Sequence, residues 1–568
     1  MADKFEVARA LREIALLLEA DGANPFKIRA YERGARAVEV LRDDVTVLAR
    51  DGRLTEVPGI GAALASTITE LATTGRSGQL EKLRSRLPSG VLELSPVLSL
   101  PRIKAVHGAL GITTLDDLKA AAEAGRLRAV GGFGEKTEAK VLEAIRGLAE
   151  RTEETLLYEA AREADSLLEH LRASRAVDRA EIGGALRRRC ETVTRIDVVM
   201  ASPEPAAALD HAVGFGLVTN VLEKGAAAAT VRIAAGITAG VEVVPPARFT
   251  AAWHRSTGSA AHRAKLGVVA EARGLRLDDG GLVKAGRRMR LPTEADLYRH
   301  LGLPYVPPEM REDEGEVEAA VQGVLPDDLV APGDLRGLVH CHTHYSDGKH
   351  SVLEMARGAE KLGMKYITIT DHSPSAHYAG GLPLDPLKKQ WEDIDRAQEQ
   401  VSVRLLRGTE SDILADGSLD YPDAVLEKLD VIIASIHNRN KMDSAAMTKR
   451  ITTAMRKRQF KIWGHALGRY VLTRPPFACD VEEILDVIAE SRAAVEINGD
   501  PHRLDMEPRW IREARKRDIR FVVSTDAHSV KGMENFRWGV DMARRGWVRK
   551  GEVLNTRDVD SFRDAVRP

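Results

Sequence analysis

Histidines and carboxylates recur at the ends of apolar segments in the second half of this 568-residue sequence. A single histidine is more often a surface or hydrogen-bonded core residue than a metal ligand. Here one segment after another ends in such a residue, and a mixed set of imidazole nitrogens and carboxylate oxygens suits manganese, zinc or iron. The set comprises His340, His342, Asp347, His372, Glu410, His437, His465, Asp526 and His528.

The apolar segments themselves predict a repeated β/α architecture from about residue 333. "KYITITDHS", "DVIIASIHN", "AAVEIN" and "FVVSTDAHS" are short β-type runs separated by helical segments. In a parallel β/α barrel the carboxyl ends of the strands face one another, so residues far apart in sequence converge there. His340 and His342 stand two apart on a strand, which places both side chains on one face. The sequence therefore predicts a metal site at the carboxyl end of a β/α barrel.

A polar pair of a different kind lies in "GGALRRRCETVTRIDVVMAS", residues 183–202. Arg195 and Asp197 stand two apart on an apolar strand and therefore share one face. A guanidinium about 4 Å from a divalent ion would repel it by roughly 8 kcal/mol at an effective dielectric constant of 20. The pair therefore favours an ion pair over a metal site on this strand.

Two glycine-bearing turns in the first 150 residues are typical of helix-hairpin-helix motifs. They are "VPGIGAALAS", residues 57–66, and "AVGGFGEKTEAKVLEAI", which begins at residue 129. A Gly-x-Gly turn that enters a helix exposes backbone N–H groups, which can hold a DNA phosphate without a positive side chain. Between them, "SPVLSLPRIKAVHGALGI" has the length of a third copy, with Ser99 and Pro101 at the glycine positions, and proline lacks the N–H. The glycines of the two intact turns are Gly59, Gly61, Gly132 and Gly134.

Composition limits the class of protein. A chain of 568 residues is too long for one core, so several domains are expected. Hydrophobic residues make up 44% of the sequence and charged residues 29%, as in an ordinary globular protein. No apolar run is long enough to cross a bilayer, and the first residues lack the features of a signal peptide. These two observations predict a cytoplasmic protein. The net charge of −1 means that DNA binding has to come from local groups. The three cysteines are too scattered for a disulfide framework or a cysteine zinc site.

The second half resembles the PHP (polymerase and histidinol phosphatase) domain over residues 333–568. The resemblance lies in "HCHTHYSDG", "TDHS", "ASIHN", "GHALGR", "EINGDPHRLD" and "STDAH". It implies a distorted β/α barrel with a three-metal cluster, manganese or zinc and in part iron, that hydrolyses phosphoesters. The nucleophile would be a metal-bound water, with no protein nucleophile. Carried over by position, one metal takes His340, His342, Glu410 and Asp526, a second takes Glu410, His437 and His465, and a third takes Asp347, His372 and His528.

The whole chain resembles the bacterial family X DNA polymerases, through "GGALRRRCETV", "VVPPARF", "STGSAAH" and "GLPYVPPEMRED". The resemblance implies a multidomain α/β protein: a helical helix-hairpin-helix region, a nucleotidyltransferase-like palm, a small thumb-like domain and the C-terminal barrel. The expected limits are 1–90 for the helical N-terminal domain, 91–149 for a fingers-like hairpin region, 150–247 for the palm, 248–311 for the thumb, 312–332 for a linker and 333–568 for the PHP domain. The acidic stretch "REDEGEVEAA" at the start of the linker indicates a solvated connector or the start of a helix.

The palm departs from the polymerase pattern at the positions that bind triphosphate and magnesium. In that family a glycine-serine turn binds the triphosphate, and an Asp-x-Asp strand with a third aspartate holds two magnesium ions. Here the turn carries Ala185, Arg195 replaces the first aspartate beside Asp197, and Gly240 stands at the third. Magnesium is therefore not expected in the palm, and Arg195 is expected to pair with Asp197 or Glu242. Glu242 leaves one alternative open, because it could supply a displaced third ligand.

The expected function is a metal-dependent DNA phosphoesterase of DNA repair, a 3′-5′ exonuclease or an abasic-site endonuclease. Its partner would be gapped, nicked or abasic DNA, with Arg187 and Arg188 adding phosphate contacts, and the protein would be a monomer. Thr67 stands where the family can carry a lyase lysine, and threonine forms no imine. Three alternatives stay open: a residual gap-filling polymerase, a small-molecule phosphatase of the histidinol phosphate type and a non-catalytic DNA-binding scaffold.

Overall fold

The computed structural model describes residues 4–567, apart from 40–44, 58, 87–93, 95–96, 151–153, 234–235 and 439–441. The chain divides into two compact units. The first comprises residues 1–153 with two short segments, 214–220 and 232–236, and the second comprises the rest. Within the described ranges, no helix is both long and apolar enough to cross a membrane.

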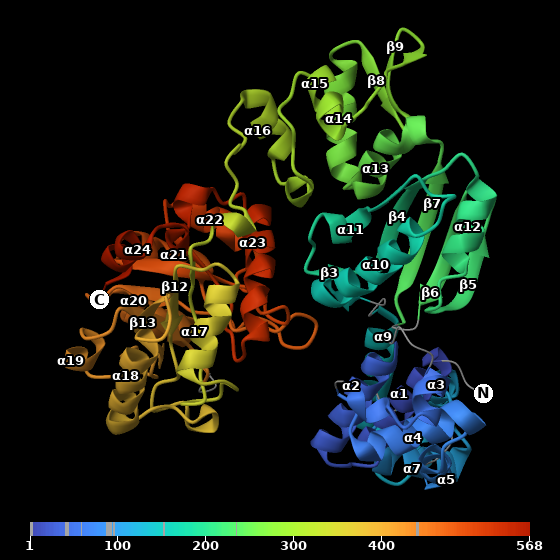
Figure 1. Ribbon diagram of the computed structural model, residues 1–568, viewed down its shortest axis with the longest axis horizontal. Helices are drawn as coiled ribbons and strands as arrows, with labels where there is room; N and C mark the ends of the chain where they lie inside the picture. The colour runs from blue at the N-terminus through green and yellow to red at the C-terminus, as the bar shows by residue number, and fades with distance from the viewer. Residues whose placement is uncertain are drawn as a thin grey trace. The chain divides into compact units, whose positions relative to one another are not determined.

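The first unit is helical up to residue 150 (Figure 1). Its core consists of aliphatic side chains at three- and four-residue spacing, such as Leu11, Ile14 and Leu18 of the first helix, which form one buried stripe. The elements are α1 (Lys4–Ala20), α2 (Pro25–Glu39), α3 (Val45–Arg50), η1 (Leu54–Glu56), α4 (Ala62–Thr74), α5 (Gly78–Arg86), α7 (Leu100–Leu110), α8 (Leu115–Glu123), η2 (Arg126–Ala129) and α9 (Glu135–Glu150).

A five-stranded sheet in the order β2-β4-β7-β6-β5, most of it in the second unit, lies in the range predicted for the palm. The central strand β4 pairs antiparallel with β2 and parallel with β7, and the second register sets Asp197 opposite Gly240. The elements are β1 (Thr155–Leu156), α10 (Leu157–Arg172), β2 (Arg179–Ile182), α11 (Gly184–Arg187), β3 (Thr192–Val193), β4 (Arg195–Ala201), α12 (Pro205–Val213), β5 (Val218–Lys224), β6 (Ala228–Ile233) and β7 (Thr238–Val244).

The thumb-like part combines helices with a three-stranded sheet in the order β10-β9-β8. It includes part of the predicted linker. Of the two expectations for this acidic stretch, a helix start is present, because α16 begins at Glu316, and a solvated connector is wrong at that residue. Glu316 is fully buried, because its carboxylate accepts from His262 Nδ1 at 2.6 Å and from two backbone N–H groups. The elements are η3 (Pro246–Arg248), α13 (Phe249–Thr257), α14 (Ala260–Glu271), β8 (Leu275–Asp278), β9 (Gly281–Lys284), β10 (Arg287–Arg288), α15 (Glu294–His300), η4 (Pro308–Met310) and α16 (Glu316–Gln322).

The C-terminal part is a sheet of seven parallel strands in the sequential order β11 to β17. Helices follow most of the strands, so the strands are buried on both faces and read as nearly continuous apolar runs. The elements are η5 (Pro332–Asp334), β11 (Gly337–Leu338), α17 (Val352–Lys361), β12 (Tyr366–Ile369), η6 (His377–Ala379), α18 (Leu384–Gln398), β13 (Arg404–Asp412), α19 (Asp423–Leu426), β14 (Val431–Ser435), α20 (Ser444–Met455), β15 (Lys461–Trp463), α21 (Val481–Ala489), β16 (Ala493–Asn498), α22 (Pro508–Lys516), β17 (Phe521–Ser524), η7 (Lys531–Asn535), α23 (Phe536–Arg545), η8 (Lys550–Glu552), η9 (Leu554–Thr556) and α24 (Val559–Val566).

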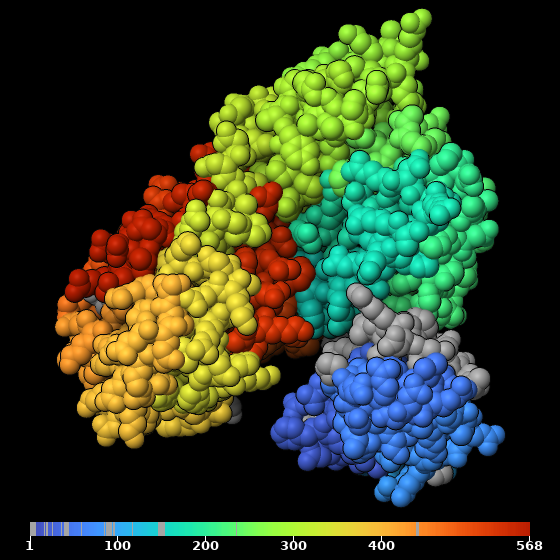
Figure 2. Space-filling view, viewed as in Figure 1, coloured from blue at the N-terminus to red at the C-terminus, as the bar shows by residue number. Residues whose placement is uncertain are grey.

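The seven strands form a nearly closed barrel, because the chain beyond the first strand meets the chain beyond the last. Cys341 pairs with Ala527 in a parallel bridge, and the N–H groups of His342 and Ala527 donate across this seam. Figure 2 shows the residues of this part, yellow to red, as one continuous body on the face in view. The predicted fold class, with a helical hairpin region, a palm-like sheet, a thumb and a distorted C-terminal barrel, is confirmed.

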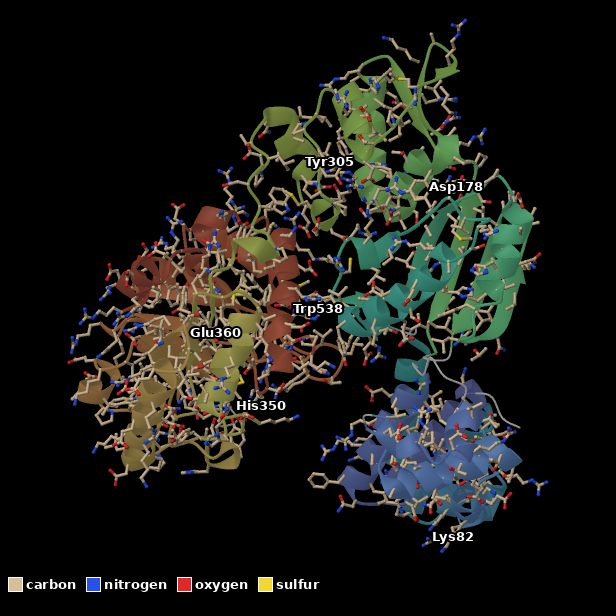
Figure 3. The ribbon with its side chains drawn as sticks, in the orientation of Figure 1. Lys82, Asp178, Tyr305, His350, Glu360 and Trp538 are labelled. Carbon is tan, nitrogen blue, oxygen red and sulfur yellow. The ribbon has the colours of Figure 1, made fainter. Side chains whose placement is uncertain are left out.

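A buried ion pair joins the palm to the thumb. Glu294 of α15 lies between two arginines: Arg311 donates to it at 2.9 Å and Arg187 of α11 at 2.6 Å. Tyr305, labelled in Figure 3, is a third partner and donates to the same carboxylate at 3.2 Å. Burial alone would raise the pKa of Glu294, but Arg311 and Arg187 outweigh burial and lower it. The carboxylate therefore stays ionised in the folded protein.

We expect Glu294→Ala to lower the free energy of unfolding by about 3 kcal/mol, because breaking a buried pair leaves two guanidinium groups without their anion. The folded pKa lies below the ordinary value of 4.5, so the carboxylate stabilises the protein above that pH, and this contribution is lost as the pH falls further. Urea unfolding at pH 7 and pH 4 measures both effects. The exposed Glu271→Ala is the control, and an equal effect of the two variants at pH 7 would contradict the assignment.

Candidate functional sites

The nine predicted histidines and carboxylates converge at the carboxyl end of the barrel. Three groups have ligand atoms within 4.8 Å of one another: His342 with Asp347, His372 and His528; His340 with His342 and Asp526; and His372 with Glu410 and His437. His465 completes the set, because its Nε2 lies 2.8 Å from Glu410 Oε1. His340 and His342 both lie beyond β11, which ends at Leu338, so the expectation that they stand on the strand itself is wrong. His340 has a positive φ, and its ring lies 5.2 Å from that of His342.

Glu410 stands at the centre of this cluster, and its two oxygens face different histidines. Oε1 faces His465 at 2.8 Å and His437 at 3.2 Å. Oε2 faces His372 at 3.0 Å, His340 at 3.3 Å and His342 at 3.5 Å. A carboxylate in this position can bridge two cations, each held by its own imidazoles.

The buried polar atoms of the cluster fit a metal centre. His340 Nε2, both ring nitrogens of His342, His372 Nδ1 and Glu410 Oε2 are buried without a hydrogen-bond partner among the described residues. Such atoms are costly to bury unless something binds them, and cations that accept nitrogen and oxygen ligands would satisfy all of them. The structure therefore suggests a metal-binding site here.

Two carboxylates that were not predicted as site residues orient these histidines. Glu496 of β16 accepts from His340 Nδ1 at 2.6 Å, and Asp412 of β13 accepts from His437 Nδ1 at 2.7 Å. Such a bond fixes the tautomer and aims the other ring nitrogen at the centre of the site. The sequence did contain a signal for both carboxylates, because Glu496 interrupts an apolar strand and Asp412 ends one.

Electrostatics in the cluster are dominated by the carboxylates. Burial lowers the pKa of His372, but Glu410 and Asp347 outweigh it and raise the pKa to about 10. Glu410 and Asp412 likewise outweigh burial at His437 and raise its pKa to about 9. His342 is different: burial and the neighbouring His372 lower its pKa to about 4. The carboxylates thus attract positive charge to the centre of the site.

A cavity of about 430 Å³ opens onto the cluster. Besides histidines and carboxylates, the residues that line it include Tyr378, Tyr470, Arg474 and Arg503. The guanidinium groups of Arg474 and Arg503 both lie over the Tyr470 ring, at 4.1 Å and 4.5 Å from its centroid. Tyr378 is 71% exposed, so a large aromatic face lies at the mouth of the cavity. A cavity of this size and polarity suits a phosphate with an attached group of about nucleotide size.

The palm strand places Arg195 where it blocks the position of Gly240. Arg195 Nε lies 2.6 Å from Asp197 Oδ1, so the predicted ion pair is present. A Cβ atom at position 240 would overlap the Arg195 guanidinium. Glu242 pairs with Arg255 instead. The guanidinium thus fills the space that a third carboxylate would need.

The turn before this strand is also occupied by protein contacts. Gly184 has a positive φ, and a Cβ there would overlap the Asp197 carboxylate. Ala185, which follows, offers no hydroxyl to a phosphate. Asp197 is therefore enclosed by the glycine turn on one side and by Arg195 on the other.

Arg187 and Arg188, the predicted phosphate contacts beside this turn, are largely buried. Arg187 pairs with Glu294 and lies 3.4 Å above the Trp253 ring. Arg188 pairs with Glu312 at 2.7 Å and donates to the Thr257 carbonyl at 2.6 Å. DNA would have to compete with these internal partners, so the geometry gives the predicted contacts no support.

The two intact hairpin turns have the same geometry. Gly59 and Gly132 have positive φ, as a left-handed turn requires, and the residue after each is buried. Nothing lies within 4 Å of a Cβ added at Gly59, Gly61, Gly132 or Gly134, so the backbone there is open to a ligand. Helices α4 and α9 begin directly after Gly61 and Gly134, and both point their free N–H groups at this open side.

The third hairpin copy, which was predicted to carry Ser99 and Pro101 at its two glycine positions, is shifted along the sequence relative to that prediction. Helix α7 begins at Leu100 with Ser99 as its N-cap, so Ser99 matches the second glycine of the intact turns and Pro101 lies in the first helical turn. The missing proline N–H still removes one donor from that helix end. Thr67, at the lyase position, is buried in α4 and donates to the Ala63 carbonyl at 3.3 Å.

Comparison with protein families gives four matches, which cover the hairpin region, the thumb-like part and the barrel. Residues 2–77 match a helix-hairpin-helix domain, and residues 102–146 match a SAM-like helix-hairpin-helix tandem. Residues 252–312 match the DNA polymerase beta thumb, and residues 339–500 match the PHP domain.

Comparison with curated proteins finds similarity along the whole chain. The sequence is 33% identical to the DNA polymerase/3′-5′ exonuclease PolX of Bacillus subtilis, over 98% of this chain and 99% of that protein. Probable phosphatases of Thermoanaerobacter sp. and Caldanaerobacter subterraneus are 28% and 29% identical, over 40% and 39% of this chain and 93% and 88% of their own lengths.

We expect Glu410→Ala to lose metal from more than one position, because the carboxylate faces two sets of histidines. Metal content after loading with manganese and gel filtration, measured by inductively coupled plasma mass spectrometry, should fall by at least two ions per chain. The exposed Glu399→Ala should keep the full content. Loss of a single ion in Glu410→Ala, with the others retained, would show that Glu410 does not bridge.

Proposed function

Because the chain belongs to the bacterial family X DNA polymerases that carry a C-terminal PHP domain, we propose that it is a metal-dependent DNA phosphoesterase of DNA repair. Its reaction would be 3′-5′ exonuclease cleavage, abasic-site incision or both. Its palm would no longer incorporate nucleotides. The observation that carries the proposal is the position of Glu410 between two sets of buried histidines at the end of the barrel.

The nine clustered residues would hold three metal ions. One set is His340, His342, Glu410 and Asp526, the second is Glu410, His437 and His465, and the third is Asp347, His372 and His528. Manganese or zinc suits this mixture of ligands, and iron is compatible at part of it. When bound, such ions supply an activated water and positive charge for the phosphate oxygens.

The chain's own side chains would then position the substrate. The described residues that line the cavity include no serine, threonine or cysteine, and the attack would fall to water. Glu496 and Asp412 hold the rings of His340 and His437 in place. Arg503 lies 3.2 Å from Asp526 and faces the cavity, where a guanidinium can bind phosphate oxygens.

DNA would be held by the hairpin turns in residues 1–149, and the barrel from residue 333 would cleave it. The open backbone at the four hairpin glycines supports this division, since it can bind phosphates of any sequence. Gapped, nicked or abasic DNA is the substrate class that we favour, because these forms expose a 3′ end or a damaged sugar beside duplex. The protein would act as a monomer.

The palm would be inactive as a polymerase because two metal-binding carboxylates are absent and a cation occupies their place. Arg195 lies over Gly240, and the displaced ligand that Glu242 could have supplied is paired with Arg255. These contacts speak against the gap-filling alternative, which the name of the Bacillus subtilis relative favours. The small-molecule alternative is favoured by the probable phosphatases that match the barrel alone, and the hairpins speak against it.

We expect the full chain with manganese to release nucleotides from a 3′ end or to incise an abasic site, and chelation to abolish this. Glu410→Ala should reduce cleavage by at least about 100-fold, because the cluster supplies the activated water. DNA affinity, measured by fluorescence anisotropy at fixed salt, should change less than twofold. Glu399→Ala is the matched control. A metal-loaded protein that cleaves no DNA, yet rapidly hydrolyses histidinol phosphate, would replace this proposal with the small-molecule phosphatase.

We expect no template-directed incorporation by the full chain on a gapped primer with magnesium or manganese. Arg195→Asp alone should not restore it, because Gly240 still leaves one ligand missing. Primer extension in the Glu410→Ala background keeps degradation from hiding a product. Extension that disappears on Asp197→Ala would prove the palm to be an active polymerase.

A further inference from the structure

Two irregular segments of the barrel line the cavity of about 430 Å³ beside the histidine cluster. The first comprises residues 468–474 and the second residues 500–503, and their lining side chains include Tyr470, Asp500 and Arg503. Both lie outside the helices and the sheet, so contacts with the surrounding protein have to hold them in place. They are called the cavity segments below.

Arg469 ties the two cavity segments together. Its side chain is buried, and its guanidinium donates to the Arg503 carbonyl at 3.0 Å and to the Leu504 carbonyl. The Asp505 carboxylate, which is fully buried, accepts from the Arg469 N–H group at 3.4 Å. A displacement of Arg469 would therefore move the backbone that carries Tyr470 in one segment and Arg503 in the other.

The carboxylate that binds the Arg469 guanidinium comes from the palm. Glu191 immediately precedes β3, and its side chain accepts from Arg469. Its carbonyl accepts from the Leu157 N–H group at 3.0 Å, where β1 pairs with β3, so its backbone is fixed within the palm. Glu507 of the barrel also faces this guanidinium, but at 3.6 Å it lies beyond hydrogen-bond distance. The palm thus supplies the hydrogen-bonded anion of Arg469.

A second contact from the palm reaches the other cavity segment. The hydroxyl of Tyr158, in the first turn of α10, lies 3.2 Å from His502 Nε2, and the two ring centroids are 5.2 Å apart. His502 Nδ1 in turn lies 3.1 Å from the carboxylate of Asp500, which lines the cavity. Because β1 leads directly into α10 and pairs with β3, Tyr158 and Glu191 belong to one local part of the palm.

We propose that the palm positions the cavity segments, with Glu191 acting through Arg469 and Tyr158 acting through His502, and that this positioning sets the affinity of the barrel for its substrate. The inference rests on the proposed hydrolysis and goes beyond it, because it gives the palm a role in a reaction that occurs in another part of the chain. Both palm residues are positioning residues, since neither lines the cavity.

The proposal predicts a change in substrate binding rather than in the chemical step. Arg503 of the second cavity segment can bind phosphate oxygens, whereas the nine clustered histidines and carboxylates belong to neither segment. Loss of an interaction that is equally strong in the bound substrate and in the transition state raises KM and leaves kcat unchanged. Variants of Glu191 and Tyr158 should therefore separate the two constants.

The test is steady-state hydrolysis of a thymidine dinucleotide by the manganese-loaded full chain. We expect Glu191→Ala to raise KM about tenfold, as for loss of a hydrogen bond to a charged group, with kcat changed less than about twofold. Glu191→Gln keeps a side-chain carbonyl that accepts from Arg469, and it should bring KM back to within about threefold of the unmodified chain. Tyr158→Phe removes the hydroxyl alone and should raise KM about threefold.

Glu314→Ala is the matched control. Glu314 Oε2 lies 2.8 Å from Arg512 of α22, so this variant also removes an ion pair to the barrel, and neither residue lines the cavity. Its KM should stay within about twofold of the unmodified value. An equal rise of KM in Glu191→Ala and Glu314→Ala would overturn the inference, and so would a lower kcat in Glu191→Ala with KM unchanged.

A double-mutant cycle tests whether Glu191 acts through Arg469. The KM of the double variant Glu191→Ala, Arg469→Ala should equal that of Arg469→Ala alone, because the carboxylate has no effect once its partner is gone. Independent, additive effects of the two changes on KM would contradict the proposed route.

Hydrogen exchange measures the position of the cavity segments without metal or activity. The Arg469 N–H group, which donates to Asp505, should exchange at least about tenfold faster in Glu191→Ala and at the unmodified rate in Glu314→Ala. Unchanged exchange in Glu191→Ala would overturn the inference and leave the proposed hydrolysis intact. An unmodified chain that hydrolyses neither DNA nor the dinucleotide, yet shows this difference in exchange, would count against the proposed function alone.

Discussion

A fully buried carboxylate, Glu410, must find positive charge on every side, and the barrel is arranged to supply it. Five histidines reach its two oxygens from the ends of different strands and the segments that follow them. A lone buried carboxylate would either take up a proton or unfold its surroundings, so the histidines and their acidic partners are as much a condition of the fold as of the chemistry. The parallel strand order, in which every strand ends on the same side, is what makes this convergence possible.

Sequence alone predicted the parts that depend on local pattern. Strand ends rich in histidine, the two glycine turns and the Arg195–Asp197 pair all follow from spacing and residue type, and they lie where expected. The positive φ of His340 was not predictable, because the residue lies at the barrel seam, where its carbonyl accepts from Ala527, nearly 190 positions away. Glu496 and Asp412 were missed since a charged residue in a buried run shows no partner until the neighbouring strand is placed.

The burial of Arg187 and Glu316 shows another limit. Both stand in charged stretches that look solvated, and a charged stretch is usually a surface. Their partners, Glu294 and His262, are remote in sequence. Packing of the thumb helix α15 against the palm brings Arg187 to Glu294, and packing of α16 against α14 within the thumb-like part brings Glu316 to His262. Pairing over such separations decides whether a charge faces water or the core, and residue spacing along the chain carries no information about it.

The contact between Arg195 and Gly240 has a consequence for the history of the palm. A side chain added at position 240 would displace the terminal atoms of Arg195, which is 48% exposed and can swing toward water. The two missing carboxylates stand at separate positions, 195 and 240, and Glu242 is engaged by Arg255. One substitution can therefore remove the arginine or add an acid, but it cannot rebuild the whole set of carboxylates, so a regained polymerase site needs at least two mutational steps.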